Sequence, residues 1–214
     1  MPSPSERFRE RLLQAFPPHA ERLGWTDAAL KAAAEEVGLS EGEVQLACPN
    51  GAIDLADAFA DRADREMLSA LADLDLPSMR IREKVRAAVS LRLEAQAPYK
   101  EAARAMTRML ARPTRAGEAA RLVWRTADRI WRALGDASTD GNFYSKRAIL
   151  SAVLASTYAR WFSDKSEDHA DTAAFLEARI ENVMQFEKFK ARLKPLGEAA
   201  ETAVGVAARF RYGG

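Results

Sequence analysis

Residues 142–163 read NFYSKRAILSAVLASTYARWFS, and bulky side chains recur along them in pairs every four positions. This spacing places the pairs on one face of an α-helix. Between residues 148 and 159 the helix carries no charge on any side over about three turns. A helix of this kind is predicted to lie at the centre of a helical bundle. The recurring pairs are Ile149-Leu150, Val153-Leu154, Thr157-Tyr158 and Trp161-Phe162.

The rest of the chain also favours helix. Alanine is abundant, β-branched residues are scarce, and no segment alternates apolar and polar residues as a strand would. The nine prolines fall where a helical pattern stops or starts, and proline disrupts a helix interior. The sequence therefore predicts an all-α fold of about ten helices, over residues 5–16, 26–37, 41–48, 51–75, 78–97, 99–111, 115–134, 142–163, 168–192 and 195–209.

The composition excludes several classes of protein. A single cysteine cannot build a disulfide framework, and with two distant histidines it does not make a common zinc site. There is no glycine-rich phosphate loop and no His-Glu-x-x-His motif, so we expect neither a metal nor a cofactor. The uncharged run at 148–159 is shorter than the ~20 residues that span a bilayer. Because Glu6 and Glu10 argue against a transit peptide, we expect a mature cytoplasmic protein.

Charge is distributed unevenly along the chain. Residues 1–60 hold 5 basic and 10 acidic residues, whereas residues 80–132 hold 14 basic and 5 acidic ones. The basic stretch could simply form solvated helix faces. Alternatively, it could attract anionic lipid headgroups at the inner face of the cytoplasmic membrane, at about 1 kcal/mol per cation.

Residues 24–59 resemble the helix-turn-helix of TetR-type transcriptional regulators. The resemblance lies in Ala32, Ala33 and Val37 on one helix, Gly38 in the turn, and Leu39-Ser40 entering the next helix. It implies a helix-turn-helix-like unit at residues 1–50 and a ligand-binding and dimerisation domain at 51–214. Residues 40–48 contain no Arg or Lys, although phosphate contacts dominate DNA affinity. We therefore predict no nucleic-acid partner, and keep a regulator with a hydrophobic ligand as the alternative function.

The most specific motif lies further along the chain. Residues 135–150 read GDASTDGNFYSKRAIL, and residues 175–180 read FLEARI. Together these segments resemble the signature of the coenzyme Q nine family of ubiquinone-biosynthesis accessory proteins. The sequence departs from the family at Gly141, where an aromatic residue is common, and at Phe143, where tryptophan is usual.

The resemblance implies a TetR-like homodimer whose C-terminal domain encloses an apolar lipid pocket. Such a protein is not a catalyst. It binds a quinone intermediate or a phospholipid, and presents quinone intermediates to the di-iron demethoxyubiquinone hydroxylase at the membrane surface. The partner surface of the family corresponds here to Asp140, Asn142, Phe143, Tyr144 and Arg147. The residues alone also fit plain helix capping with an Arg–Asp pair.

A lipid pocket needs apolar side chains that helix packing leaves free. Methionine suits a flexible isoprenoid because it is soft and unbranched. The candidates fall at helical spacing, so each one can equally be plain core. They are Met106, Met109, Trp124, Trp131, Leu150, Leu154, Trp161, Phe162 and Phe175.

Two further readings of the sequence stay open. In the family, the last helix is associated with membrane contact, but residues 195–209 carry few bulky apolar side chains and suit dimer or domain packing equally well. An enzyme reading would make the chain a lyase or hydrolase that uses Tyr144, Lys146 and Arg147 as acid and anchors. No other motif supports that reading.

Overall fold

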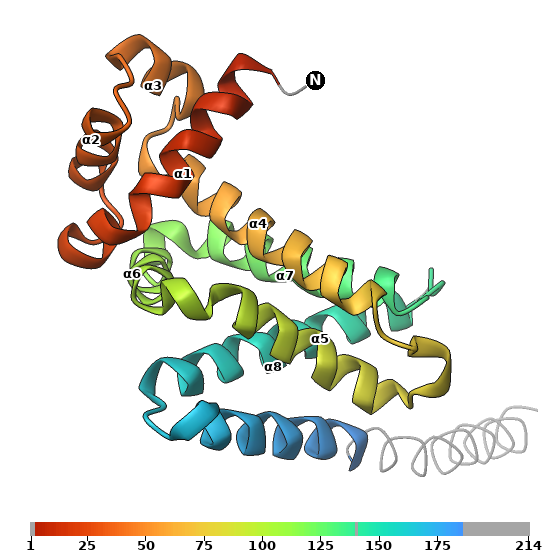
Figure 1. The fold of residues 1–214 in the computed structure, drawn as a ribbon. Helices are drawn as coiled ribbons and strands as arrows, with labels where there is room; N and C mark the ends of the chain where they lie inside the picture. The colour runs from red at the N-terminus through yellow and green to blue at the C-terminus, as the bar shows by residue number, and fades with distance from the viewer. Residues whose placement is uncertain (1–2, 140, 186–214) are drawn as a thin grey trace, which may run out of the picture.

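The computed structural model describes residues 3–139 and 141–185, and this part of the chain is all-α, as predicted (Figure 1). Short 3-10 helices join several of the longer ones: η1 (Leu76–Ser78), η2 (Ala97–Tyr99), η3 (Pro113–Arg115) and η4 (Glu167–His169). Residues 170–185 are helical as well. The α-helices are α1 (Pro4–Leu23), α2 (Asp27–Glu36), α3 (Glu41–Ala47), α4 (Ala52–Ala72), α5 (Ile81–Gln96), α6 (Lys100–Leu110), α7 (Ala116–Ala133) and α8 (Gly141–Ser163).

The count of about ten helices is slightly off, although the class is right. The predicted helix 168–192 is described only to residue 185, and the predicted helix 195–209 lies outside the described residues. Most predicted boundaries fall within a few residues of the observed ones. No helix in the described ranges is long and apolar enough to cross a membrane.

The first helix does not stop at Pro17-Pro18, and that prediction was wrong. α1 continues through both prolines to Leu23. Proline inside a helix costs roughly 3 kcal/mol because a backbone hydrogen bond is lost. The second half of α1 offsets this cost by packing against α2, with Ala20 fully buried and His19 Nε2 at 2.7 Å from a carboxylate oxygen of Glu36.

Helices α1, α2 and α3 form the small N-terminal unit that the sequence suggested. Ser40 and Glu43 make a capping box at α3, and Gly38, with a φ of +64°, allows the tight turn before it. The indole N–H of Trp25 donates to the Ala52 carbonyl at 2.7 Å and ties the unit to α4. One hydrophobic cluster runs from α1 through α4 and α6 to Trp161. The core thus crosses the proposed boundary at residue 50, and the division at this point stays a prediction.

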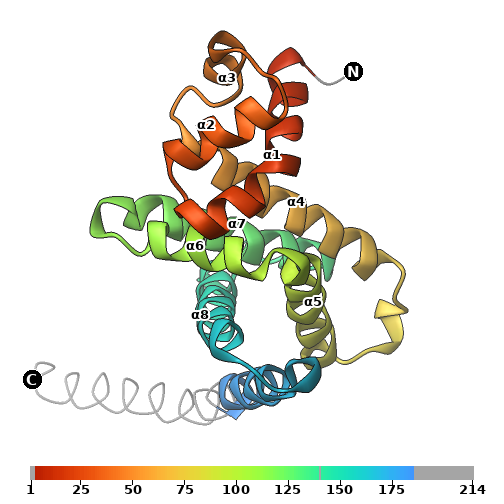
Figure 2. The same ribbon diagram turned by 60° about the vertical axis from the view of Figure 1, so that its left-hand side comes forward.

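Helices α4 to α8 form the larger body beneath this unit. Figures 1 and 2 show α4 and α7 on its upper side, α5 and α8 below them, and the segment 170–185 under both. α8 buries one face, through Leu150, Val153, Leu154, Thr157 and Trp161. Its opposite face is exposed at four alanines, so α8 is not enclosed on all sides as its lack of charge had suggested. These residues are Ala148, Ala152, Ala155 and Ala159.

Candidate lipid pocket and aromatic surface

An apolar pocket of about 320 Å³ lies among helices α4 to α8. This volume is at the lower end of the roughly 300–1,000 Å³ typical of ligand sites. Much of its wall is alanine, whose short side chain leaves space that a larger residue would fill. Met106 on α6 and Leu154 on α8 line it, as the sequence analysis had suggested for a ligand site. Its other residues are Ala60, Arg92, Gln96, Ala103, Thr107, Leu110, Ala111, Ala119, Ala120, Leu122, Val123, Thr126, Ala155 and Tyr158.

The other lipid candidates do not converge on this pocket. Trp131 and Leu150 line a smaller hollow of about 80 Å³ beside the segment 170–185, and Trp131 also borders one of about 440 Å³. Trp161 is fully buried and lines a separate hollow of about 160 Å³. The remaining candidates line none of these spaces: Met109, Trp124, Phe162 and Phe175.

One end of the 320 Å³ pocket is polar, and several of its side chains are hydrogen-bonded in a network around a buried carboxylate. Asp64 on α4 is 0% exposed and accepts from Arg92 Nε at 2.8 Å, Thr126 Oγ1 at 2.9 Å and Arg129 Nη1 at 3.1 Å. Arg92 also contacts the hydroxyl of Tyr158. Burial lowers the pKa of Arg92, but Tyr158 and Asp64 outweigh it and hold that pKa above its usual value. Burial raises the pKa of Tyr158, so its hydroxyl stays neutral.

Sequence reasoning missed this network because its members come from four helices. A signal was present, since Asp64 falls within the apolar stripe of α4, among Ala60, Ala63 and Met67. A carboxylate in such a stripe must find a buried partner, because leaving it unpaired costs several kcal/mol. The stripe alone does not show that the partner is Arg92.

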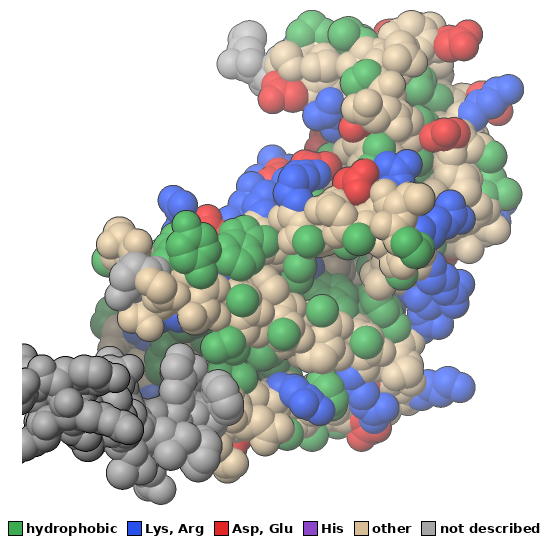
Figure 3. Space-filling view, turned by 180° about the vertical axis from the view of Figure 1, so that it is seen from behind, with side chains coloured by type: hydrophobic (Ala, Val, Ile, Leu, Met, Phe, Trp, Pro, Cys, Tyr) green, Lys and Arg blue, Asp and Glu red, His purple; other side chains and the backbone are tan. Residues whose placement is uncertain are grey.

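A second feature is a group of aromatic side chains on the surface where α8 begins. Tyr144 is 65% exposed, and its ring centroid lies 5.1 Å from that of Phe143 and 6.4 Å from that of Trp124 on α7. Figure 3 shows hydrophobic side chains gathered on this side of the molecule, beside Lys and Arg side chains. Exposed aromatic groups next to cations are typical of protein-binding surfaces.

Arg147 supports this surface from beneath. Its side chain is 1% exposed and forms ion pairs with Asp128 at 2.7 Å and Asp136 at 3.0 Å. Its guanidinium carbon lies 3.5 Å from the ring centroid of Phe143. Lys146 binds Asp136 at 2.6 Å, and the hydrogen bonds from Lys146, Ser138 and Arg147 hold the pKa of Asp136 well below its usual range, despite burial.

Two predicted partner residues remain, Asn142 and Asp140. Asn142 is exposed and lines the 440 Å³ hollow, together with Lys146. Asp140 lies outside the described residues. The Arg–Asp pair fits the interpretation of this segment as plain helix capping, and the exposed Tyr144 fits its interpretation as a partner surface. The geometry accommodates both.

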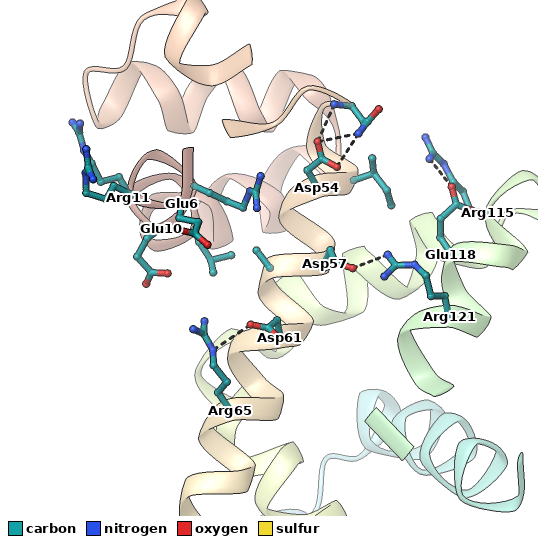
Figure 4. Close-up of a pocket in the computed structure, with 16 residues that line it drawn as sticks. Glu6, Glu10, Arg11, Asp54, Asp57, Asp61, Arg65, Arg115, Glu118 and Arg121 are labelled. Carbon is teal, nitrogen blue, oxygen red and sulfur yellow. Dashed lines mark hydrogen bonds and ion pairs between the residues drawn. The ribbon is translucent and has the colours of Figure 1, made fainter. Parts of the chain in front are cut away.

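A larger hollow is a charged groove of about 1040 Å³ between α1, α4 and α7, which the sequence did not indicate (Figure 4). It is lined by as many arginines as acidic residues, and several pair with one another. Asp57 binds Arg121 at 2.6 Å, and Asp61 binds Arg65 at 3.2 Å. Such exposed pairs contribute little to stability.

The α4–α7 contact also explains part of the uneven charge distribution. Arg125 binds Asp57 at 2.9 Å, and Arg129 binds Asp61 at 2.7 Å. Cations from the basic stretch 80–132 therefore pair with acids from earlier in the chain, and those cations do not form a free lipid-facing surface.

Neither a metal centre nor a reactive thiol stands out. Among the described residues, no group of His, Cys, Asp and Glu is arranged to hold a metal ion. Burial raises the pKa of Cys48 to about 11, so the thiol is protonated and packs as a small apolar side chain.

Comparison with known proteins places these features in context. The COQ9 family model matches residues 116–187, which include the start of α8 and the aromatic group. The chain is 29% identical over 201 residues to the ubiquinone biosynthesis protein COQ9, mitochondrial, of Homo sapiens, covering 91% of this chain and 63% of the relative. It is 27% identical over 186 residues to the probable ubiquinone biosynthesis protein coq9, mitochondrial, of Dictyostelium discoideum, covering 84% of this chain and 61% of the relative. The chain thus spans about three-fifths of the length of these relatives.

A solved structure supports the fold. The TetR transcriptional regulator from Nitrosomonas europaea superposes with a TM-score of 0.67 and 22% identity, over 82% of this chain and 97% of that one. At this identity the likeness shows a TetR-like fold alone. The resemblance drawn from the motifs is confirmed: the chain has a TetR-like fold and is similar to the COQ9 family of ubiquinone biosynthesis proteins.

Proposed function

We propose that this protein is a non-catalytic, lipid-binding accessory protein of ubiquinone biosynthesis. In this proposal it holds an isoprenoid quinone intermediate and presents it to the di-iron demethoxyubiquinone hydroxylase. The relatives support the pathway, since their names describe ubiquinone biosynthesis proteins and no catalytic activity. The observation that carries the proposal is the apolar pocket lined by Met106 and Leu154.

The pocket suits a flexible apolar chain better than a rigid polar substrate. Met106 and Leu110 are buried on α6, Leu122 is buried on α7, and Leu154 faces them from α8. Methionine adapts its shape to a flexible ligand at little cost. With a volume of about 320 Å³, the pocket is small, so a long isoprenoid tail would extend beyond its mouth. A phospholipid acyl chain is the competing occupant.

The hydroxylase is proposed to bind the aromatic surface made by Trp124, Phe143 and Tyr144. Aromatic residues often dominate the binding energy of such surfaces. The exposed Asn142 would form part of its rim. Because Arg147 is buried, its proposed role is to hold Phe143 in place rather than to touch the partner.

The assembly and the location belong to the same proposal. The exposed, uncharged alanines of α8 at positions 148, 152 and 159 are proposed to form the homodimer interface. We propose that the dimer contacts the inner face of the cytoplasmic membrane peripherally, through those cations of residues 80–132 that α4 does not neutralise. Anionic headgroups would attract them.

A transcriptional regulator is the second candidate, and the TetR-like fold favours it at the level of architecture. The charge of α3 opposes it, because Glu41 and Glu43 occupy its first turn and the helix contains no Lys or Arg. Fold alone does not establish function.

Mass spectrometry of an organic extract of the purified protein tests the leading proposal. We expect an isoprenoid quinone, or a ring-modified precursor of one, to copurify with the wild type. Ala119→Leu places a larger side chain at a half-buried position of the pocket wall and should prevent the quinone from copurifying. Ala28→Leu on the exposed face of α2 should not. An empty wild type, or a quinone retained after the pocket is filled, would contradict the proposal.

A further inference from the structure

The polar end of the 320 Å³ pocket leaves one hydrogen-bond donor without a partner. Gln96 on α5 is 1% exposed and lines the pocket. Its Oε1 accepts from the Tyr158 hydroxyl at 2.6 Å and from Arg92 Nη1 at 3.5 Å. These two donors fix which end of the amide is the oxygen. Nε2 is buried and has no hydrogen-bond partner among the described residues.

A buried N–H group without a partner costs about 1–3 kcal/mol. Proteins rarely retain that cost unless a ligand or an ordered water supplies the acceptor. Beyond this polar end, most of the wall is alanine, leucine and methionine. An apolar ligand that carries one acceptor atom would therefore satisfy Gln96 and fill the rest of the pocket.

The charges beside Gln96 balance one another. Arg92 is paired with Asp64, and Arg129 is shared between Asp61 and Asp64. Arg65, a further partner of Asp61, is exposed and lines the charged groove instead. Arg92 is the arginine that lines the pocket, and because it is paired with Asp64, no unbalanced cation of this network faces the pocket. A phosphate headgroup would have to lose its water next to Asp64 without a free cation in return, which is unfavourable.

We infer that the pocket selects a neutral head group through Gln96, whose Nε2 donates one hydrogen bond to a carbonyl oxygen of the ligand. The ring of a quinone carries such an oxygen, and its isoprenoid tail would run along Met106 and Leu110 towards the mouth. The inference rests on the proposed function and deepens it, because it favours a quinone over an anionic phospholipid and names the residue that discriminates between them.

Calorimetric titration of the whole chain tests this inference with three probes. These are a ubiquinone bearing one isoprene unit, a benzene bearing the same tail and no ring oxygens, and a short-chain phosphatidylglycerol. Gln96→Glu keeps an oxygen for Tyr158 and Arg92 but replaces the donor with an acceptor. We expect it to weaken binding of the quinone about tenfold and to change binding of the hydrocarbon less than about twofold. Gln45→Glu on exposed α3 is the matched control and should change neither.

Infrared spectroscopy of the quinone bound to the wild type gives a second readout that needs no variant. A hydrogen bond to one carbonyl should shift its stretching band to lower frequency and leave the other band in place. Equal quinone affinity in wild type and Gln96→Glu, two unshifted carbonyl bands, or tighter binding of phosphatidylglycerol than of the quinone would overturn the inference. If the wild type binds neither the quinone nor the hydrocarbon, both the inference and the proposed function fail. If it binds both, and Gln96→Glu leaves both affinities unchanged, only the inference fails.

Discussion

At the scale of single residues, the candidate partner surface depends on one exposed ring and the buried groups beneath it. Tyr144 is largely exposed, and Phe143 next to it rests on the buried guanidinium of Arg147. Asp136 and Asp128 hold that guanidinium in place. The exposed ring and the buried cluster can therefore be changed separately. We expect a change in the ring to affect partner binding and a change in the cluster to affect stability.

Tyr144→Ala removes exposed aromatic area and little core. We expect binding to the purified hydroxylase to weaken about tenfold or more, as at other aromatic hot spots, with the melting temperature unchanged. Surface plasmon resonance measures the binding affinity for the hydroxylase, and circular dichroism measures the melting temperature. Ser145→Ala, an exposed neighbour, is the control. A large loss of thermal stability in Tyr144→Ala would show instead that the ring is structural.

Asp136→Asn should destabilise the fold by about 3 kcal/mol at pH 7, because Arg147 would lose one of its two buried or half-buried carboxylate partners. The pKa of Asp136 is lowered in the folded state. Its ion pairs therefore stabilise the fold above the unfolded-state pKa of about 3.9, and this contribution is lost as the pH falls through the folded-state value.

Urea unfolding at a series of pH values measures this difference. The gap in unfolding free energy between wild type and Asp136→Asn should be full at pH 7 and narrow steadily below about pH 4. A gap independent of pH over that range would show that the Asp136 carboxylate is not what stabilises the cluster.

At the scale of elements, local sequence signals place the ends of several helices well, and α3 shows why this does not extend to function. Ser40 and Glu43 cap it, and Gly38 makes the turn before it, the place where the sequence put a turn. The resulting helix occupies the place of a recognition helix in a helix-turn-helix unit. Its side chains nevertheless offer acids where a DNA-binding helix would offer cations.

We therefore expect no measurable, salt-dependent binding of this protein to duplex DNA at physiological ionic strength. Fluorescence anisotropy with a labelled duplex, repeated at falling salt concentrations, checks this. As a positive control for the assay, a known TetR-type repressor with its own operator should bind more tightly as salt is removed. Comparable salt-dependent binding by this chain would revive the regulator candidate.

At the scale of the whole molecule, the uncharged face of α8 remains exposed after the described chain has folded. One face of α8 packs into the body, while Ala152 and Ala159 lie exposed on the opposite side. A face without charge is unusual on a solvated surface, and a second copy of the chain would cover it.

Ala152→Glu should therefore convert the proposed dimer to a monomer, since it buries a charge at the interface. Light scattering coupled to size-exclusion chromatography reports the mass, and Ala28→Glu on exposed α2 should leave it unchanged. A wild type that is monomeric at micromolar concentration, or an Ala152→Glu variant that stays dimeric, would contradict the proposed interface.

Local information was enough to specify the helices: their caps, their apolar spacing and the absence of strand patterns all act between residues a few positions apart. The motif at 135–150 likewise pointed to the family before any fold was considered. The long-range contacts were not readable in this way. Asp64 pairs with Arg92 on another helix, and α1 continues through Pro17 and Pro18 because it packs against its neighbours. Met106 and Leu154, from two different helices, line one pocket, whereas Met109 and Phe175 do not line it. Helical periodicity shows which side of a helix is apolar, but the neighbour that side meets, and the space left between them, depend on how the helices pack.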